Sequence, residues 1–112
     1  MRATFHLVPV EAWEDADRGK PYAAASLAAE GFIHCTDGEP ELAATFDRHY
    51  ATDPRSFLAL TLDLDALDVP WRFDDPGSPY PHIYGPIHWA AILEVQRVER
   101  RPDGHFEALT PA

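Results

Sequence analysis

Three histidines lie in short segments that together could hold a small polar ligand. They are His6 in FHLV, His34 in EGFIHCT and His82 in PHIYGPI. Side chains two residues apart in a strand share one face, so Thr36 lies beside His34. The same rule places Tyr84 beside His82. Because imidazoles donate and accept hydrogen bonds near neutral pH and hydroxyls orient polar groups, we expect these five side chains to line one concave site.

The two strand histidines, His34 and His82, are the expected acid and base of any reaction at this site. His6 and Thr36 are expected to place the ligand. The alternative for each histidine is a structural role, in which the ring only satisfies a backbone carbonyl at a strand edge. Three histidines together with Tyr84 favour the site.

Cys35 is not expected to act with its neighbour His34, because adjacent strand residues point to opposite faces. It shares a face with Ile33 and should be buried and inert. A metal site built from His34, Cys35, His82 and His88 is not expected, since these residues lack the close paired spacing of zinc ligands. The sequence also contains no glycine-rich phosphate loop, no GxSxG elbow and no HExxH motif.

The charge balance limits the kinds of partner. Nine Lys and Arg stand against 19 Asp and Glu, a formal net charge of −10. Nucleic acid bound without sequence preference and anionic membranes would both be repelled. A compact anionic ligand needs a local cationic patch, backbone amides or a helix N-terminus. The sequence therefore favours a small, sheltered ligand site.

Size and cysteine content indicate one domain over residues 1–112 in a reducing compartment. A chain of 112 residues closes one hydrophobic core and has no room for a second. Its single cysteine excludes an internal disulfide, and its first residues lack a signal peptide or membrane helix. We expect a cytoplasmic protein whose oligomeric state the sequence does not define.

The hydrophobic pattern predicts a mixed α+β fold. Strands are expected over residues 3–8, 32–36, 56–64, 91–100 and 105–109, the last two forming a hairpin. Helices are expected from about Val10 to a stop at Gly19, over residues 23–30 and over residues 39–50. His49 in the third helix and His105 in the last strand are expected on the surface.

The helix over residues 39–50 has the clearest pattern. Leu42, Phe46 and Tyr50 recur at four-residue spacing and form one apolar stripe. Thr36 or Asp37 is the expected N-terminal cap.

The strand over residues 56–64 alternates, with one strongly apolar face made of Leu58, Leu60, Leu62 and Leu64. It is expected to be central in a sheet. The stretch over residues 68–81 holds four prolines, which predicts an extended loop that carries a short strand.

Three segments together resemble the bacterial domain of unknown function 952 family. They are FHLV at 5–8, EGFIHCT at 30–36 and PHIYGPI at 81–87, linked by the apolar strand at 57–64. The resemblance covers nearly the whole chain. It includes Trp13 in the first helix and Ser26-Leu27 before EGFIHCT.

The order of elements in that family is similar to the ADP-ribosyltransferase superfamily, in particular its RNA 2′-phosphotransferase branch. This resemblance implies two small antiparallel-rich sheets that form a cleft for NAD, with two to three helices. The histidine motifs of the first two strands match His6 and the step from His34 to Thr36. The third motif commonly supplies a glutamate, and here the comparable segment offers His82 and Tyr84.

The expected site has catalytic and ligand-binding members. The catalytic pair is His34 and His82, and no metal ligands are expected. The expected ligand-binding residues are His6, Tyr22, Ser26, Thr36 and Tyr84.

Three functions follow as hypotheses. The first is an NAD-dependent ADP-ribosyl or related transferase, with NAD as cofactor. The second is a non-catalytic binding module for a nucleotide-like or phosphorylated small molecule. The third is a protein-interaction domain whose histidines are incidental.

Overall fold

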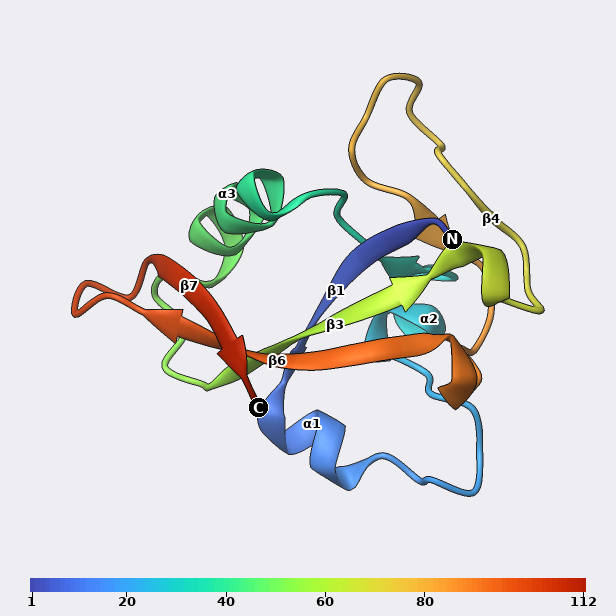
Figure 1. The fold of residues 1–112 in the computed structure, drawn as a ribbon, viewed down its shortest axis with the longest axis horizontal. Coiled ribbons are helices and arrows are strands. Elements are labelled where there is room, and N and C mark those ends of the chain that lie inside the picture. Colours follow the sequence, from blue (N-terminus) through green and yellow to red (C-terminus); the bar gives the residue numbers. More distant parts are fainter.

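The chain builds two antiparallel sheets, and the larger one carries both terminal strands (Figure 1). The computed structural model describes residues 1–112. The order in the larger sheet is β1-β3-β6-β7. Its strands are β1 (Ala3–Pro9), β3 (Phe57–Asp63), β6 (Ile92–Arg100) and β7 (Phe106–Pro111). β1 and β7 are therefore the edge strands, and β3 is central as its sequence predicted.

The smaller sheet has the order β2-β5-β4, and each of its strands is two residues long. The strands are β2 (Ile33–His34), β4 (Trp71–Arg72) and β5 (His82–Ile83). Phe5 in β1 joins the two sheets through paired backbone hydrogen bonds of 2.9 and 2.8 Å with Thr36. This bridge places the small sheet beside the outer edge of β1.

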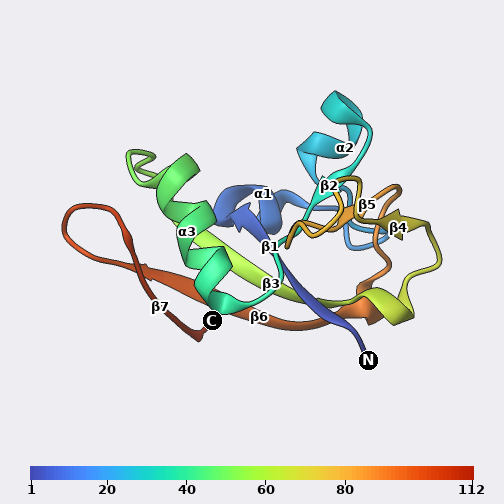
Figure 2. The ribbon, with the colours of Figure 1, turned by 90° about the horizontal axis from the view of Figure 1, so that it is seen from above.

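Three α-helices complete the α+β fold, whose two antiparallel sheets confirm the predicted class. They are α1 (Val10–Asp15), α2 (Ala25–Glu30) and α3 (Glu39–Tyr50), and two 3-10 turns cover Leu64–Ala66 and Trp89–Ala91. In Figure 2 the large sheet lies lowest, with α3 above one end and α2 with the small sheet above the other. None of the helices has the length and apolar character needed to cross a lipid bilayer.

The predicted end of the first helix was wrong. α1 ends at Asp15, and Ala16 already has an extended backbone with ψ 136°. Gly19 lies in the following turn, where its N–H donates to the Asp17 carboxylate over 2.8 Å. This local hydrogen bond competes with helix formation, so the helix stops before the glycine.

The predicted cap of α3 was also wrong. Gly38 is the N-terminal cap residue, and its φ of 82° is a conformation that glycine adopts without steric cost. Asp37 instead pairs with Arg2 over 2.6 Å, and the Thr36 backbone is held by the bridge to Phe5. Both candidate caps are therefore committed to contacts with the start of β1.

β3 separates two hydrophobic clusters. Its leucine face packs in a cluster that contains Ile33 and Ile83 of the small sheet. Its opposite face places Phe57 and Ala59 against Phe46 of α3. The sequence predicted only the leucine face as strongly apolar, whereas both faces are buried because helix and small sheet cover opposite sides of the strand.

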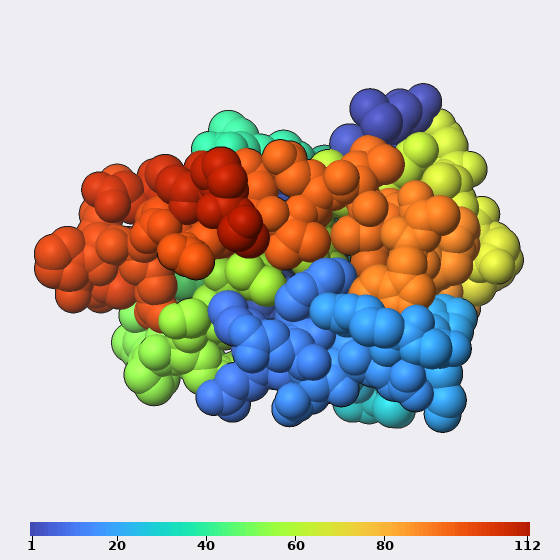
Figure 3. Space-filling view, turned by 60° about the horizontal axis from the view of Figure 1, so that its bottom comes forward, coloured from blue at the N-terminus to red at the C-terminus, as the bar shows by residue number.

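The β6–β7 hairpin extends along one side of the molecule. In Figure 3 it runs in orange and red beside the blue region that contains α1. Arg100 at the end of β6 holds the hairpin to α3, because its guanidinium donates to the carbonyl oxygens of Tyr50 and Ala51 over 2.9 and 3.1 Å. It also donates to the Gly104 carbonyl over 2.9 Å.

Candidate functional site

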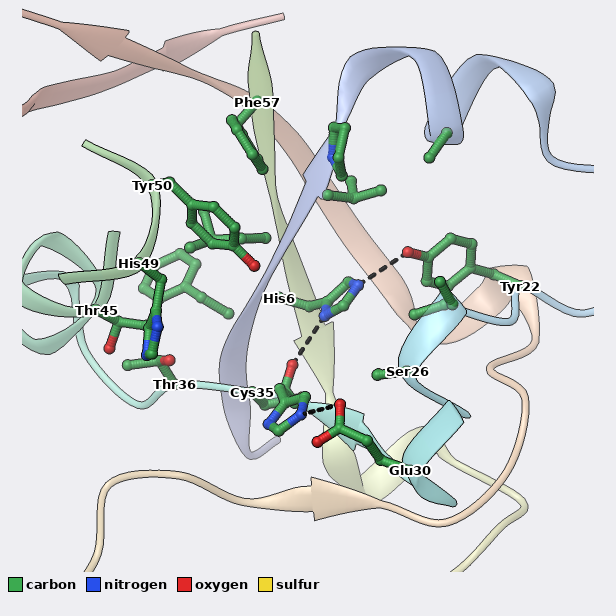
Figure 4. A pocket seen from close by; sticks show the side chains of 18 of the residues that line it. His6, Tyr22, Ser26, Glu30, Cys35, Thr36, Thr45, His49, Tyr50 and Phe57 are labelled. Atoms are coloured by element: carbon green, nitrogen blue, oxygen red, sulfur yellow. Dashed lines mark hydrogen bonds and ion pairs between the residues drawn. The ribbon is translucent and has the colours of Figure 1, made fainter. Parts of the chain in front are cut away.

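A pocket of about 830 Å³ lies across the edge of β1 (Figure 4). α3 forms one wall, and α2 with the segment before it forms the other. Its volume is within the range of small-molecule sites, roughly 300 to 1,000 Å³. The polar residues that line it are His6, Tyr22, Ser26, Glu30, His34, Thr36, Thr45, Arg48, His49, Tyr50, Arg55, Tyr80 and His82.

All but one of the seven site residues expected from the sequence lie around this pocket. The exception is Tyr84, which was expected to line it. β5 ends at Ile83, and the Tyr84 N–H donates to the Pro70 carbonyl. This hydrogen bond continues the antiparallel pairing of β5 with β4 by one residue, and the centroid of the Tyr84 ring lies 4.2 Å from the Arg72 guanidinium. Its hydroxyl donates to Asp74 Oδ2, the carboxylate oxygen that His82 also contacts, and neither Tyr84 nor Asp74 lines the pocket.

His6 is held in one tautomer by two protein contacts. Its Nδ1 lies 2.8 Å from the His34 carbonyl oxygen, which can only accept, so Nδ1 carries the proton and donates. Its Nε2 therefore accepts from the Tyr22 hydroxyl over 2.8 Å. Burial lowers the pKa of His6 to about 4. His6 is thus neutral near pH 7, and both ring nitrogens are occupied.

Tyr22 is positioned by His6 and by the backbone. Its N–H and C=O exchange hydrogen bonds of 2.7 Å with Ile87, and its ring packs 5.8 Å from Trp13 and 6.1 Å from Trp89. Burial raises the pKa of its hydroxyl, so the group stays protonated. Because the hydroxyl uses its proton to donate to His6, its oxygen can only accept a hydrogen bond from a ligand.

The pocket exposes the backbone of Leu7. At the two ends of β1, Val10 donates its N–H to Ser56 and Arg2 accepts from the Leu64 N–H. Backbone groups alternate in direction along an antiparallel strand, so the even-numbered residues of β1 form their hydrogen bonds with β3. Odd-numbered residues point outward, as Phe5 does. Leu7 therefore offers one N–H and one C=O to the pocket.

Two carboxylate–imidazole pairs lie at the small-sheet end. His34 Nε2 is 2.9 Å from Glu30 Oε2, and His82 Nδ1 is 2.7 Å from Asp74 Oδ2. The two imidazole centroids are 5.6 Å apart. The hydrogen bond from Arg72, and after it the one from His82, lowers the pKa of Asp74. Asp74 is therefore ionised near pH 7.

Arginines of α3 and of the segment that follows it give the pocket a cationic side. Arg55 is paired with Asp53 over 2.7 Å, which lowers the pKa of that carboxyl to about 2. Arg48 has no carboxylate partner, and its guanidinium donates to the Tyr80 hydroxyl over 3.1 Å. Arg48 is the uncompensated positive charge at the pocket.

Several lining residues were not expected from the sequence. Glu30 and His34 are four residues apart, yet the break at Gly31 hid their contact. Thr45, Arg48 and His49 follow helical i, i+3, i+4 spacing on the face of α3 that borders the pocket. His49 is exposed, as expected, but it also lines the pocket mouth.

Cys35 lies where its strand parity predicted. Its side chain is 2% exposed and packs in the cluster with Ile33. Burial raises the pKa of its thiol, which disfavours the reactive thiolate. No group of three or more His, Cys, Asp and Glu side chains is arranged to hold a metal ion.

The fold and site define an α+β protein with a small-molecule-sized pocket where two antiparallel sheets meet. The chain belongs to the family described as protein of unknown function (DUF952), whose model matches residues 7–95. This confirms the first resemblance seen in the sequence. The comparisons give no support to the further resemblance to ADP-ribosyltransferases.

Two solved structures of one bacterial protein are similar to this chain in fold. Two structures of protein CC0527 from Caulobacter crescentus, one of them a double mutant, share 18% identity with this chain. Each match covers 94% of this chain and 93% of that chain with a TM-score of 0.73. No curated protein matches the chain.

Proposed function

We propose that the pocket binds a nucleotide-type ligand that carries a carboxamide, with NAD as the first candidate. The observation that carries this proposal is the outward-facing N–H and C=O of Leu7 at the edge of β1. A primary carboxamide has a donor and an acceptor side by side, so it can exchange two hydrogen bonds with one strand residue. Nicotinamide is such a group.

The rest of the lining suits the remaining parts of a nucleotide. Tyr22 and Ser26 supply hydroxyl groups for ribose, and Glu30 supplies a carboxylate. Arg48 supplies a guanidinium that can bind phosphate. It is a local positive charge in a chain whose net charge is −10. Leu7 and Arg48 line the same pocket, so one ligand with a carboxamide at one end and a phosphate at the other could contact both.

A second candidate is transfer or hydrolysis at the nicotinamide ribose, which Glu30 favours. The sequence offered no glutamate for this role, but the carboxylate of Glu30 lines the pocket beside His34. A carboxylate can stabilise the positive charge that develops at a sugar carbon when its bond to nitrogen breaks. Release of nicotinamide from NAD measures this reaction directly.

The binding proposal is tested by comparing nicotinamide with nicotinic acid. Nicotinamide should shift the amide signal of Leu7 in nitrogen–proton spectra. Nicotinic acid should bind about tenfold more weakly or worse, because its carboxylate has no donor for the Leu7 carbonyl, at a cost of about 1 to 3 kcal/mol. Equal affinity of the two compounds would contradict the role of Leu7.

Arg48→Ala provides the matched variant for the phosphate end. It should weaken NAD by about tenfold while leaving nicotinamide unchanged, since only NAD carries phosphates. Calorimetric titration measures both. Failure of the wild-type protein to bind NAD or any other nucleotide at millimolar concentration would overturn the proposal.

A further inference from the structure

His34 and His82 face the same space with one ring nitrogen each to spare. They are cross-strand partners in β2 and β5, so their side chains share one face of the small sheet. Glu30 occupies Nε2 of His34, and Asp74 occupies Nδ1 of His82. His34 Nδ1 and His82 Nε2 make no hydrogen bond within the protein.

Each carboxylate prepares its imidazole for proton transfer. A carboxylate on one ring nitrogen fixes the tautomer and stabilises the imidazolium that forms when the other nitrogen takes a proton. With rings 5.6 Å apart, the two free nitrogens can act on opposite sides of one reacting atom. The two imidazoles are therefore close enough to serve as the base and the acid of one reaction.

Exposure distinguishes the two histidines. The His34 side chain is 54% exposed, whereas that of His82 is 20% exposed. The His82 ring is stacked on Phe32 with centroids 4.0 Å apart and planes at 16°. Water therefore reaches His34 more readily, and His82 is the more rigidly held of the two.

A positive charge lines the same pocket as this pair. Tyr80 and His82 flank Pro81 on the same segment, and Arg48 donates to the Tyr80 hydroxyl. Arg48, Tyr80, His34 and His82 all line the pocket. A pocket that holds one guanidinium and two imidazoles is a suitable setting for a phosphoryl group.

We propose that His34 and His82 form a general base and general acid that hydrolyse a small nucleoside phosphodiester held by Arg48; this rests on the pocket being a nucleotide site. His34 removes a proton from water as the water oxygen bonds to phosphorus. The bond from phosphorus to the leaving alkoxide oxygen breaks, and His82 donates its proton to that oxygen. The products are a phosphomonoester and an alcohol, and no other reactant is consumed.

The chemistry of the site selects this class of substrate. An alkoxide is a poor leaving group and needs the proton that a general acid supplies, whereas a phosphate leaving group in a pyrophosphate needs it far less. Cys35 cannot replace water as the nucleophile, since it faces the core. The net charge of −10 disfavours a long polyanion, so the substrate is a mononucleotide or dinucleotide.

The test uses 2′,3′-cyclic AMP as substrate and chromatography of the 2′- and 3′-AMP products. The wild-type protein should hydrolyse it with a rate that falls at both low and high pH, because one imidazole must be neutral and the other protonated. His34→Ala and His82→Ala should each lower kcat by about a hundredfold or more. Circular dichroism of each variant establishes that it is folded.

His105→Ala is the matched control. His105 also pairs with a carboxylate, Asp103, over 3.1 Å, but it lies in the β6–β7 hairpin outside the pocket. Its replacement should leave kcat unchanged. Hydrolysis that persists in both His34→Ala and His82→Ala would overturn the proposal.

The binding measurement separates this proposal from the previous one. If the wild-type protein binds the cyclic nucleotide or NAD but produces no AMP, the acid–base proposal fails and the nucleotide pocket stands. If it binds no nucleotide at all, both fail. His34→Gln and His82→Asn each place an amide nitrogen where the imidazole nitrogen contacts the carboxylate but cannot shuttle a proton, so folded, binding and inactive variants support the proposal.

Discussion

His6 links the pocket to the pH dependence of folding. Its burial holds the pKa at about 4 in the folded protein, against an ordinary value of 6.5 in the unfolded chain. The folded state therefore binds fewer protons than the unfolded state between these two values. The contribution of His6 to stability is fully present above pH 6.5 and is lost as pH falls toward 4.

A His6→Gln variant isolates this contribution, because glutamine can donate and accept but does not titrate in this range. The wild-type protein should lose about 3 kcal/mol of unfolding free energy between pH 6.5 and 4 through His6 alone. The variant should show a loss smaller by that amount. Urea unfolding at a series of pH values measures the difference, and identical pH profiles would contradict the pKa assigned to His6.

Strand parity was sufficient to predict which side chains of β2, β5 and the residues next to them share a face. It correctly separated Ile33 and Cys35, which are buried, from His34, which is exposed. It also placed Tyr84 on the His82 side of the small sheet, where both side chains contact Asp74 Oδ2, but parity does not say how far the pocket extends, and Tyr84 lies beyond its lining. Glu30 was missed because a contact across a helix end depends on the left-handed Gly31, which has a φ of 90°.

Among the elements, α3 was predicted at its observed bounds, Glu39–Tyr50. A twelve-residue amphipathic pattern contains enough turns to define a helix. The three strands of the small sheet have two residues each, which is too short for any alternation to appear. Their positions are determined by packing against β3 and by the bridge between Phe5 and Thr36.

The junction between the hairpin and α3 should be sensitive to one glycine. Gly104 has a φ of +94°, and a Cβ there would lie far closer to the Ala51 carbonyl oxygen than van der Waals contact allows. Gly104→Ala should cost about 3 kcal/mol, from the left-handed backbone and from overpacking that displaces Arg100. Thermal or urea unfolding measures this loss.

Gly77→Ala is the control for backbone strain alone. Gly77 has a φ of +78°, but apart from its own chain neighbours no atom lies within 4 Å of the position that a Cβ would take. Its replacement should cost only about 1 kcal/mol. Equal losses in the two variants would show that the close approach of Gly104 to α3 is unimportant.

At the scale of the whole molecule, charge opposes the entry of an anionic ligand. The chain carries −10 and spans 39 Å along its longest axis. The Debye length is about 30 Å at 0.01 M salt and about 8 Å at 0.15 M, so low salt exposes the ligand to the entire negative charge. At about 0.15 M salt, only charged groups near the pocket, such as Arg48, exert an electrostatic force on the ligand.

The association rate of NAD should therefore increase, by roughly two- to tenfold, as salt is raised from about 0.01 M to 0.15 M. Nicotinamide, which is neutral, should show no such change. Stopped-flow fluorescence measures both rates. A rate for NAD that falls over this range would mean that the local cationic side outweighs the charge of the whole protein.

The open edge of β1 also bears on how copies of the chain avoid aggregation. An uncovered strand edge is a template on which another chain can add a strand. Here Phe5 is already paired with Thr36, and Pro9 has no N–H, which leaves Leu7 as the single residue between them that points outward. One residue cannot nucleate an intermolecular ladder, so the gap that admits a ligand is too short to recruit a second protein strand.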